Sequence, residues 1–461
     1  MNKTKIIATL NKDNCDKKIL KHLILNGINA FKINIDNTNF DFCSKVISLI
    51  NELNDELKTH VAIMLDMNGP IIKIGHILNG EAKLNKEDKI RIYKDSVLGD
   101  YTKFSVDYDL FNKIPINTSL TTNSGLKLRV LDKQDDYLLC HVLKEGIIKD
   151  DMILNVENIK VNKNYLNDIE KNIILFSSEN NVDFLILSNI SSSEDVLEVN
   201  DLLISIGNDH LQIVSKVDNR FAVLDIDKII KISDAIIIDQ KSLGYDIAIE
   251  KVPGIQKRII SKCICNGVIN IVMTELNEGT NYNKSDVSDI ANAILDGTDC
   301  VMLSLNSEPI KTIQMLKRII NTVEEDIDYE YMLSQAIKTE KKDATGSLAY
   351  SVAGCALRLK CKAIFTPTMS GYTAKRISRF RPICPIIAPT PDELTTKSLA
   401  LSFGVYPILI DKLNSLDAII EKSKILAKNI LLLKEKDNII LTGGYPFKKV
   451  KHTNFMKIEE L

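Results

Sequence analysis

Short runs of branched apolar residues recur along the first two thirds of the chain, and a segment of helical length and periodicity follows each run. Continuous Val, Ile and Leu runs of this length are typical of strands buried on both faces of a parallel sheet. Eight strands that alternate with helices favour a TIM barrel, although an open doubly wound sheet would show the same alternation. The eight runs occupy residues 4–10, 28–35, 60–67, 182–189, 212–217, 234–239, 268–273 and 300–305.

Two other regions break this pattern. Between the third and fourth runs the sequence changes to short alternating segments such as KIRIYKD and YLLCHVL, which predict a small all-β insert at the top of the barrel. From about residue 340 a new α/β block begins, with an apolar helix over 346–359 and strands over 362–366, 383–388 and 438–442. The predicted domains are a barrel (1–69 and 163–335), a β insert (70–162) and a C-terminal α/β domain (336–461).

The composition narrows the class of protein. The 461 residues exceed what one hydrophobic core ordinarily supports, so two or three domains are expected. A net charge of -2 excludes a global basic field of the kind that binds nucleic acid or an acidic membrane. The nine cysteines form no CxxC pair, which indicates reduced thiols. There is no signal-peptide pattern and no uncharged apolar run of about 18 residues, so we expect a cytoplasmic protein.

Ordered segments along the whole chain carry a specific resemblance. They include KTKIIATL at the start, VDYDLF in the insert, SKVDN and SDVSDIANAILDGTDCVMLS in the barrel, and TMSGYTAKRISRFRP and HTNFMKI near the end. Together these segments resemble the pyruvate kinase family. The resemblance implies a catalytic TIM barrel, a small β-barrel lid inserted after the third strand and a C-terminal α/β regulatory domain. It also implies the glycolytic transfer of a phosphoryl group from phosphoenolpyruvate to ADP, with Mg²⁺ and K⁺ as cofactors and a tetrameric assembly.

Phosphoryl transfer depends mainly on positioning and on positive charge, so the charged positions decide whether the chemistry survives. Lys216, in SKVDN, matches the family's catalytic lysine, and Thr274 matches a threonine thought to help relay a proton to the enolate. Each could also be a strand-end residue retained by descent alone. Lys32 replaces a phosphate-binding Arg, which keeps the charge but loses the bidentate fork. Lys73 likewise stands where the family has an Arg of the substrate site.

The two carboxylates that hold magnesium in the family are both altered. Asp218 replaces a Glu and is one methylene shorter, so its oxygens lie roughly 1.5 Å further back. The family segment ARGDLG reads Asp239-Gln240-Lys241-Ser242-Leu243-Gly244, so Ser242 replaces the second carboxylate. Gln240 replaces an Arg, and Lys241 replaces a Gly whose backbone approaches the substrate. We expect weak magnesium binding, with the Lys241 ammonium near the metal position, where it could anchor an anion instead.

The potassium site is altered in the same way. Asn34 and Asp66 match two of the family's ligands, but Asp36 replaces a Ser and Met67 replaces a Thr. A thioether beside an added carboxylate is a poor copy of an oxygen cage, so weak K⁺ binding is expected as well. The sequence leaves open whether Asp36 pairs with Lys32 and fills the cation site with a salt bridge.

The C-terminal domain keeps a loop that resembles the one that binds an effector phosphate in the family. Hydroxyls and backbone N–H groups before a helix suit an anion, and the ligand implied is a phosphorylated sugar. A helix cap made by Ser370 or Thr373 would explain the same residues without a ligand. The loop comprises Thr368, Met369, Ser370, Gly371, Tyr372 and Thr373, and segment 443–454 resembles the loop that closes over the sugar.

The replacements gather at charged strand-end positions, while the segments that build the barrel core are ordinary for the family. We therefore expect a pseudoenzyme, a pyruvate-kinase-like protein with little or no catalysis. Such a chain could act as a structural or regulatory subunit that oligomerises with an active pyruvate kinase paralogue or with itself, without binding nucleic acid or membrane. Two alternatives stay open: an active pyruvate kinase with altered metal coordination, or a sensor of phosphorylated metabolites through the C-terminal domain.

Overall fold

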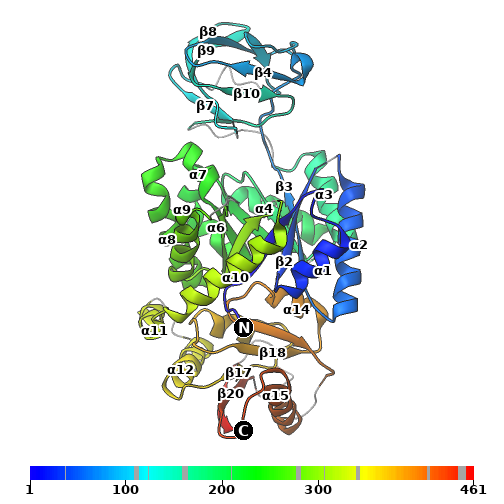
Figure 1. The fold of residues 1–461 in the computed structure, drawn as a ribbon, viewed down its shortest axis with the longest axis vertical. Coiled ribbons are helices and arrows are strands. Elements are labelled where there is room, and N and C mark those ends of the chain that lie inside the picture. The colour runs from blue at the N-terminus through cyan, green and yellow to red at the C-terminus, as the bar shows by residue number, and fades with distance from the viewer. Residues whose placement is uncertain are drawn as a thin grey trace.

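The computed structural model has three layers stacked along its long axis (Figure 1). The β insert lies at one end, the barrel in the middle and the C-terminal domain at the other end, and the N-terminus lies where the barrel meets the C-terminal domain. The structure describes residues 1–36, 38–107, 114–122, 124–157, 165–208, 210–276, 282–305, 307–338, 343–412, 416–444 and 453–461.

The middle layer is a closed barrel of eight parallel strands in the order β1-β16-β15-β14-β13-β12-β3-β2. The strands are β1 (Lys5–Leu10), β2 (Ala30–Ile35), β3 (Ala62–Met67), β12 (Phe184–Leu187), β13 (Gln212–Val217), β14 (Ala235–Asp239), β15 (Ile269–Thr274) and β16 (Cys300–Ser304). Each predicted apolar run overlaps one of these strands, which confirms the TIM barrel. Fully buried side chains, among them Ile7, Met64 and Phe184, fill the interior, so the barrel is a packed core and not a pore.

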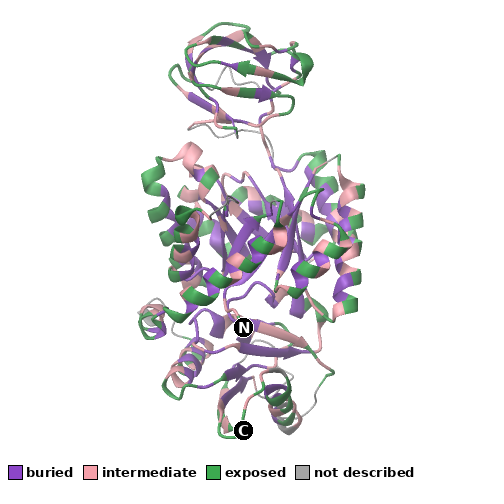
Figure 2. Ribbon diagram, in the orientation of Figure 1, coloured by how far each residue is buried: buried purple, intermediate pink, exposed green. Residues whose placement is uncertain are grey.

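Helices cover the outside of the barrel, with their apolar sides against the strands and their polar sides exposed (Figure 2). They are α1 (Lys17–Leu25), α2 (Phe40–Leu57), α3 (Asp168–Glu179), α4 (Ser193–Ser205), α5 (Arg220–Leu224), α6 (Ile226–Ile232), α7 (Gln240–Asp246), α8 (Val252–Asn266), α9 (Lys284–Leu295) and α10 (Pro309–Glu325). The next helix, α11 (Tyr329–Lys338), lies at the junction with the C-terminal domain, and its Leu333 packs into the core of that domain. The side chains of Asn167, Asn219 and Asn283 cap α3, α5 and α9 by accepting backbone N–H groups.

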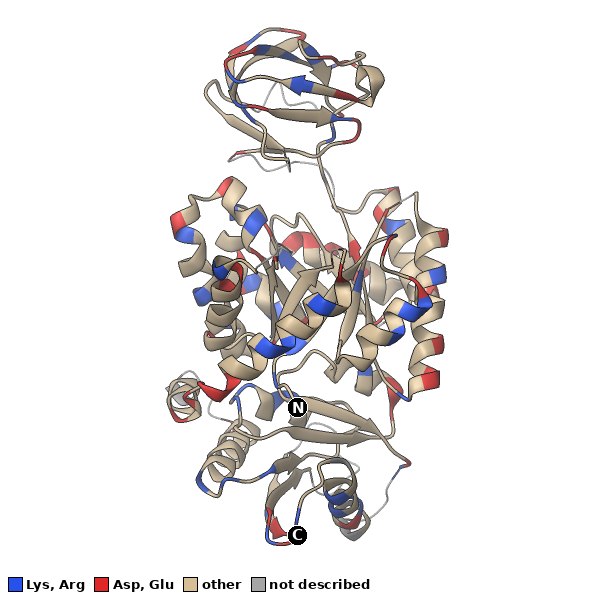
Figure 3. Ribbon diagram, in the orientation of Figure 1, with Lys and Arg blue, Asp and Glu red and all other residues tan. Residues whose placement is uncertain are grey.

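Acidic and basic residues are interspersed over these helices (Figure 3). Among the described helices, none is long and apolar enough to cross a membrane.

The insert lies between β3 and α3 and has an apolar core of its own. Its strands are β4 (Glu81–Leu84), β5 (Lys89–Tyr93), β6 (Lys103–Ser105), β7 (Ser119–Thr122), β8 (Lys127–Lys133), β9 (Tyr137–Lys144), β10 (Gly146–Lys149) and β11 (Leu154–Val156). They form a six-stranded sheet in the order β11-β7-β8-β9-β5-β6 and a two-stranded sheet of β10 with β4. Buried and outward-facing residues alternate, as in β9, where Leu138, Cys140 and Val142 are buried.

The C-terminal domain is built on a five-stranded sheet in the order β19-β18-β17-β20-β21. Its elements are α12 (Ala344–Arg358), β17 (Ala363–Phe365), α13 (Tyr372–Ser378), β18 (Ile386–Thr390), α14 (Glu393–Leu399), β19 (Val405–Leu409), α15 (Leu416–Ile430), β20 (Asn438–Gly443) and β21 (Phe455–Glu460). The predicted strand segments overlap β17, β18 and β20. Strands β19 and β21 were not predicted: β21 mixes polar and apolar residues, and the apolar run of β19 contains Pro407.

The C-terminal domain closes the amino-terminal end of the barrel. Ala400 and Leu401, which follow α14, pack against the residues of the barrel interior. Beside this contact the guanidinium of Arg381 forms a bidentate pair with the Asp299 carboxylate, at 3.0 and 3.1 Å. Asp299 precedes β16 and also accepts the backbone N–H of Phe403 at 3.1 Å. One buried carboxylate therefore joins the barrel wall to two segments of the C-terminal domain.

A second ionic contact crosses the same interface. The Nζ atom of Lys397, in α14, lies 3.6 Å from Oδ1 of Asp183 at the start of β12. Asp183 also accepts the backbone N–H of Ile63 at 2.8 Å. Burial raises the pKa of Asp183 to about 6, although Lys397 opposes the shift. The interface thus contains a carboxylate that is costly to keep ionised.

This raised pKa predicts that Asp183 destabilises the fold as the pH rises. In the unfolded chain the carboxyl titrates near its ordinary value of about 4, whereas the folded value is about 6, so the folded state binds more protons between these values. Lowering the pH from 7 to 5 should therefore add about 1 kcal/mol to the free energy of unfolding from this group. Urea denaturation should show that Asp183→Asn loses this increment, whereas Asp135→Asn, at an exposed position, keeps it. An equal pH dependence in all three proteins would contradict the assignment.

Candidate active site

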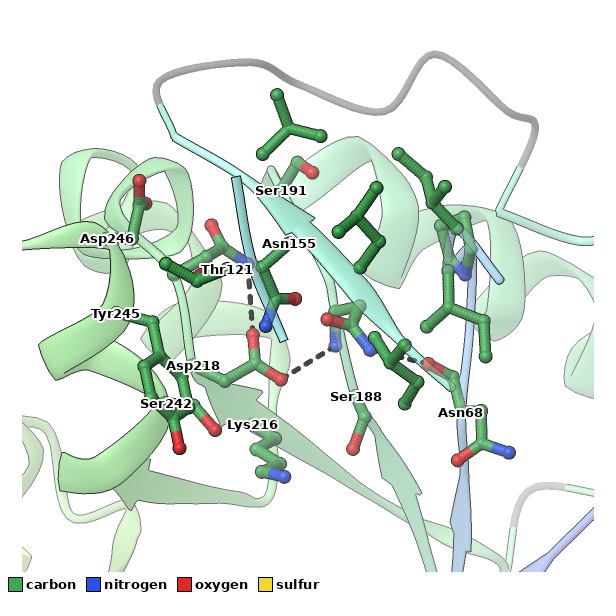
Figure 4. Close-up of a pocket in the computed structure, with 18 of the residues that line it drawn as sticks. Asn68, Thr121, Asn155, Ser188, Ser191, Lys216, Asp218, Ser242, Tyr245 and Asp246 are labelled. Atoms are coloured by element: carbon green, nitrogen blue, oxygen red, sulfur yellow. Dashed lines mark hydrogen bonds between the residues drawn. The ribbon is translucent and has the colours of Figure 1, made fainter. Parts of the chain in front are cut away.

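A cavity of about 370 Å³ lies between the mouth of the barrel and the β insert. It is at the carboxyl ends of the barrel strands, where TIM barrels place their active sites, and β7 and β11 of the insert line its opposite side (Figure 4). Most of its polar lining consists of amides and hydroxyls rather than charges. These residues are Asn34, Asn68, Thr121, Asn155, Ser188, Asn189, Ser191, Asn219 and Ser242.

Lys216 projects from the end of β13 into the floor of this cavity (Figure 4). Its Nζ atom lies 3.0 Å from Oδ2 of Asp239, which ends the neighbouring strand β14. Burial would lower the pKa of the ammonium, but the surrounding carboxylates, Asp239 foremost, raise it. The lysine is therefore protonated at neutral pH and already has a counter-charge.

Asp239 is the site residue that the sequence reasoning missed. Its side chain caps α7, because Oδ1 accepts the backbone N–H of Ser242 at 3.1 Å. Its Oδ2 accepts the Ser242 hydroxyl at 2.8 Å as well as the Lys216 ammonium. The signal was present in the matched segment, where Asp239 stands in place of the first residue, an alanine, of ARGDLG. One carboxylate is missing at position 242, and another appears one helical turn earlier.

Asp218 also lines the cavity and is buried. Its Oδ2 accepts the backbone N–H of Asn189 at 2.9 Å, and its Oδ1 accepts the side-chain amide of Asn219 at 3.0 Å (Figure 4). Burial raises its pKa to about 6, against the effect of Lys216. The cavity therefore contains a carboxylate whose two oxygens each already accept a hydrogen bond.

Lys32 and Asp66 form a second buried pair, on β2 and β3. The Nζ atom of Lys32 lies 2.7 Å from Oδ2 of Asp66, and the Ser188 hydroxyl donates to Oδ1 at 2.6 Å. Burial would raise the pKa of Asp66, but Lys32 and Lys216 hold it below its ordinary value. The sequence left open whether Lys32 pairs with Asp36. In the structure Lys32 pairs with Asp66 instead.

Of the other residues matched to the potassium site, Asn34 lines the cavity, whereas Asp36 and Met67 do not. Asn34 is exposed in β2 but lines the cavity. Asp36 accepts the backbone N–H of Thr38 at 2.8 Å and its hydroxyl at 2.6 Å. Met67 is fully buried in the core between the strands and the helices. The described residues at this position therefore do not fit a potassium site.

Lys241 does not lie where the sequence led us to expect it. Its Nζ atom lies 2.8 Å from Oε1 of Glu275, and both side chains are more than half exposed. Lys241 is absent from the lining of the cavity, so its ammonium does not stand near the matched metal position. The attraction of Glu275 at the end of the neighbouring strand β15 accounts for this outward direction.

Three further predicted residues also lie outside the cavity lining. The side-chain amide of Gln240 donates to Oε1 of Gln256 at 2.5 Å. Thr274 is buried, and its hydroxyl has no partner among the described residues. Lys73 lies in the connection from barrel to insert, where its backbone N–H donates to Asp107 at 2.7 Å. Of the predicted residues, the structure brings Lys32, Asn34, Asp66, Lys216, Asp218 and Ser242 to one cavity.

The predicted effector loop turns tightly before α13. Gly371 has a φ of 73°, and its N–H donates to the Thr368 hydroxyl at 2.9 Å. The Thr373 hydroxyl lies 2.8 Å from that of Thr453 in a buried pair, while Met369 and Ser370 are exposed. The N-cap residue of α13 is Gly371, which has no side chain to form a cap. A helix cap made by Ser370 or Thr373 therefore does not explain these residues. Tyr372 begins the helix, and most of segment 443–454, residues 445–452, lies outside the described residues.

The side chains at the matched magnesium position do not fit that ion. Mg²⁺ demands oxygen ligands at short, nearly octahedral distances. Asp218 offers one carboxylate with two hydrogen bonds already made, and Ser242 offers a hydroxyl that donates to Asp239. No group of three His, Cys, Asp or Glu side chains that could hold a metal occurs in the described part of the chain.

The whole chain is similar to known pyruvate kinases. Residues 1–310 match the pyruvate kinase barrel domain, and residues 346–459 match the pyruvate kinase alpha/beta domain. A pyruvate kinase of Clostridium perfringens is 35% identical over 474 residues, which cover 100% of both chains. A pyruvate kinase of Clostridium acetobutylicum is 32% identical over 470 residues, covering 100% of this chain and 99% of the relative.

A solved structure has the same fold. The crystal structure of a pyruvate kinase from Cryptosporidium parvum superposes with a TM-score of 0.90 at 27% sequence identity. The match covers 100% of this chain and 96% of the other. The likeness therefore extends over all three layers.

The buried pair on β2 and β3 predicts an asymmetric response to mutation. Asp66→Asn should lower the free energy of unfolding by about 3–5 kcal/mol, because it leaves the Lys32 ammonium buried without its counter-charge. The double variant Lys32→Met/Asp66→Asn should recover part of this loss. Lys241→Met, which breaks the exposed pair with Glu275, should cost less than about 1 kcal/mol. Equal losses for Asp66→Asn and Lys241→Met in urea denaturation would show that burial does not determine the cost.

Proposed function

Because the chain belongs to the pyruvate kinase family, we propose that it retains the family's architecture and ligand cavity but transfers a phosphoryl group from phosphoenolpyruvate to ADP slowly or not at all. One observation carries this proposal. Ser242 stands where the family has a magnesium-binding carboxylate, and its hydroxyl donates to Asp239 at 2.8 Å. The remaining carboxylate, Asp218, is one methylene shorter than the family's Glu.

The state of the two cavity lysines supports the same conclusion. Transfer between phosphoenolpyruvate and ADP brings two polyanions together, and positive charge aimed at the moving phosphoryl group supplies most of the catalysis. Lys216 and Lys32 are each paired with a carboxylate, at 3.0 and 2.7 Å. A bound phosphate would have to compete with Asp239 and Asp66 for these ammonium groups. We derive no catalytic step through magnesium, since the residues at its position do not fit it.

An active enzyme with altered metal coordination remains the alternative, and Asp239 is the observation that favours it. This carboxylate lies beside Lys216 and close enough to Asp218 to raise the pKa of that group in addition to the effect of burial. Two carboxylates thus remain near the matched metal position, though displaced from the family's pattern. Both oxygens of Asp239 are, however, already used by Ser242 and Lys216.

The activity can be tested by restoring carboxylates at positions 218 and 242, where the family has its two magnesium ligands. In an assay coupled to lactate dehydrogenase, the wild-type protein should turn over at least about 100-fold more slowly than the Clostridium perfringens pyruvate kinase assayed beside it. The variant Asp218→Glu/Asp239→Ala/Ser242→Asp should gain at least about tenfold, because it places both carboxylates at the family's positions and releases Lys216. Ser242→Ala serves as the control and should gain nothing. Robust wild-type turnover that Lys216→Met abolishes would overturn the proposal in favour of the alternative.

We further propose that the chain acts as a structural or regulatory subunit, assembled with an active pyruvate kinase or with itself. The tetrameric assembly that the resemblance to the family implies supports this role. Co-expression with an active pyruvate kinase from the same source should give a mixed oligomer that co-elutes on size exclusion. Separate elution with unchanged activity would rule out the mixed assembly. Binding of a phosphorylated sugar at the C-terminal loop stays a prediction.

A further inference from the structure

A second, much smaller cavity lies in the crevice between the barrel and the C-terminal domain. Its volume is about 20 Å³, and it lies between the end of α8 with the start of β15 on one side and α13 on the other. The charged residues of its lining are Lys375, Arg379, Arg381 and Asp299.

Asp299 is fully engaged with one of these cations. Its Oδ1 accepts Arg381 at 3.0 Å and the backbone N–H of Phe403 at 3.1 Å. Its Oδ2 accepts Arg381 at 3.1 Å and the side-chain amide of Asn270 at 2.7 Å. Arg379 donates to the carbonyl oxygen of Cys265 at 2.8 Å. The Asp299 carboxylate therefore neutralises Arg381 and does not neutralise Lys375.

Lys375 is the cation that most clearly needs compensation. Burial lowers the pKa of its ammonium, and the carboxylate that opposes this shift, Asp234, forms no ion pair with it. Two polar groups of the lining are buried and have no hydrogen-bond partner among the described residues, the Ser402 hydroxyl and the Nε–H of Arg381. These two groups and the Lys375 ammonium can all donate a proton to an anion.

We propose that this crevice binds one small monoatomic anion, chloride, held by Lys375, Arg381 and the Ser402 hydroxyl. The space suits a single particle of about the size of a water molecule and excludes a tetrahedral oxyanion such as phosphate. A water molecule would satisfy the Ser402 hydroxyl but would leave the positive charge uncompensated, which is costly in a partly buried site. The anion joins α13 to the barrel wall and is independent of the chemistry at the barrel mouth.

Bromide in place of chloride makes the site visible. Crystals of the full-length protein grown in sodium bromide should give an anomalous peak in the crevice, in contact with Lys375 and Ser402. The absence of this peak, in a map that shows bromide at exposed lysines, would overturn the proposal. A peak of equal height in crystals of Lys375→Met would also overturn it, because the binding would not then depend on this ammonium.

The same proposal predicts a response in solution. At a constant sodium concentration, replacing gluconate by chloride should raise the melting temperature of the wild-type protein by roughly 2 °C once chloride exceeds its dissociation constant about tenfold. Lys375→Met and Ser402→Ala should lose this rise, while Lys362→Met, at an exposed position of the same domain, should keep it. An equal rise in the melting temperature of all four proteins would identify a general salt effect and would contradict the proposed chloride site.

Discussion

A charge that is withdrawn from water has to be compensated by hydrogen bonds or by an opposite charge nearby, and ion pairs meet this constraint at both ends of the barrel. At the mouth, Asp66 and Asp239 hold Lys32 and Lys216 at 2.7 and 3.0 Å. At the opposite end, Asp299 holds Arg381 at 3.0 Å. Breaking a buried pair of this kind costs far more than breaking an exposed one, because the remaining partner stays buried without compensation. Ion pairing thus attaches the C-terminal domain to the barrel through Arg381, and at the mouth it engages Lys32 and Lys216, the ammonium groups that a bound phosphate would need.

The sequence predicted the fold well because burial leaves a strong pattern in it. Continuous apolar runs mark strands covered on both faces, and all eight barrel strands fall on such runs. Strands β19 and β21, which lie at the edges of their sheet and are only partly covered, were not predicted. The sequence of β21 mixes polar and apolar residues, and the apolar run of β19 contains Pro407, which is atypical of a strand interior. The local pattern is clearest where a strand is buried on both faces or alternates regularly.

The site was less predictable, because a residue type gives a charge but not the direction in which it points. Lys32, Asp66, Lys216 and Asp218 were identified from their motifs, and the structure brings them to one cavity. Lys241 was identified by the same means, yet it turns outward to Glu275. Asp239 was not predicted, because in the matched segment it replaces an alanine, and its partners Lys216 and Ser242 become apparent only in the folded chain. The partners of a charged residue depend on neighbouring strands that are distant in the sequence.

The contact of Ala400 and Leu401 with the barrel interior restricts which truncations of the chain evolution can tolerate. A fragment that ended before these residues would open one end of an apolar barrel to water and would tend to aggregate. We therefore expect the barrel to depend on the C-terminal domain for its solubility, whatever happens to the chemistry at the other end. Selection against misfolding would then preserve the barrel and the C-terminal domain even in a lineage that no longer needed the reaction.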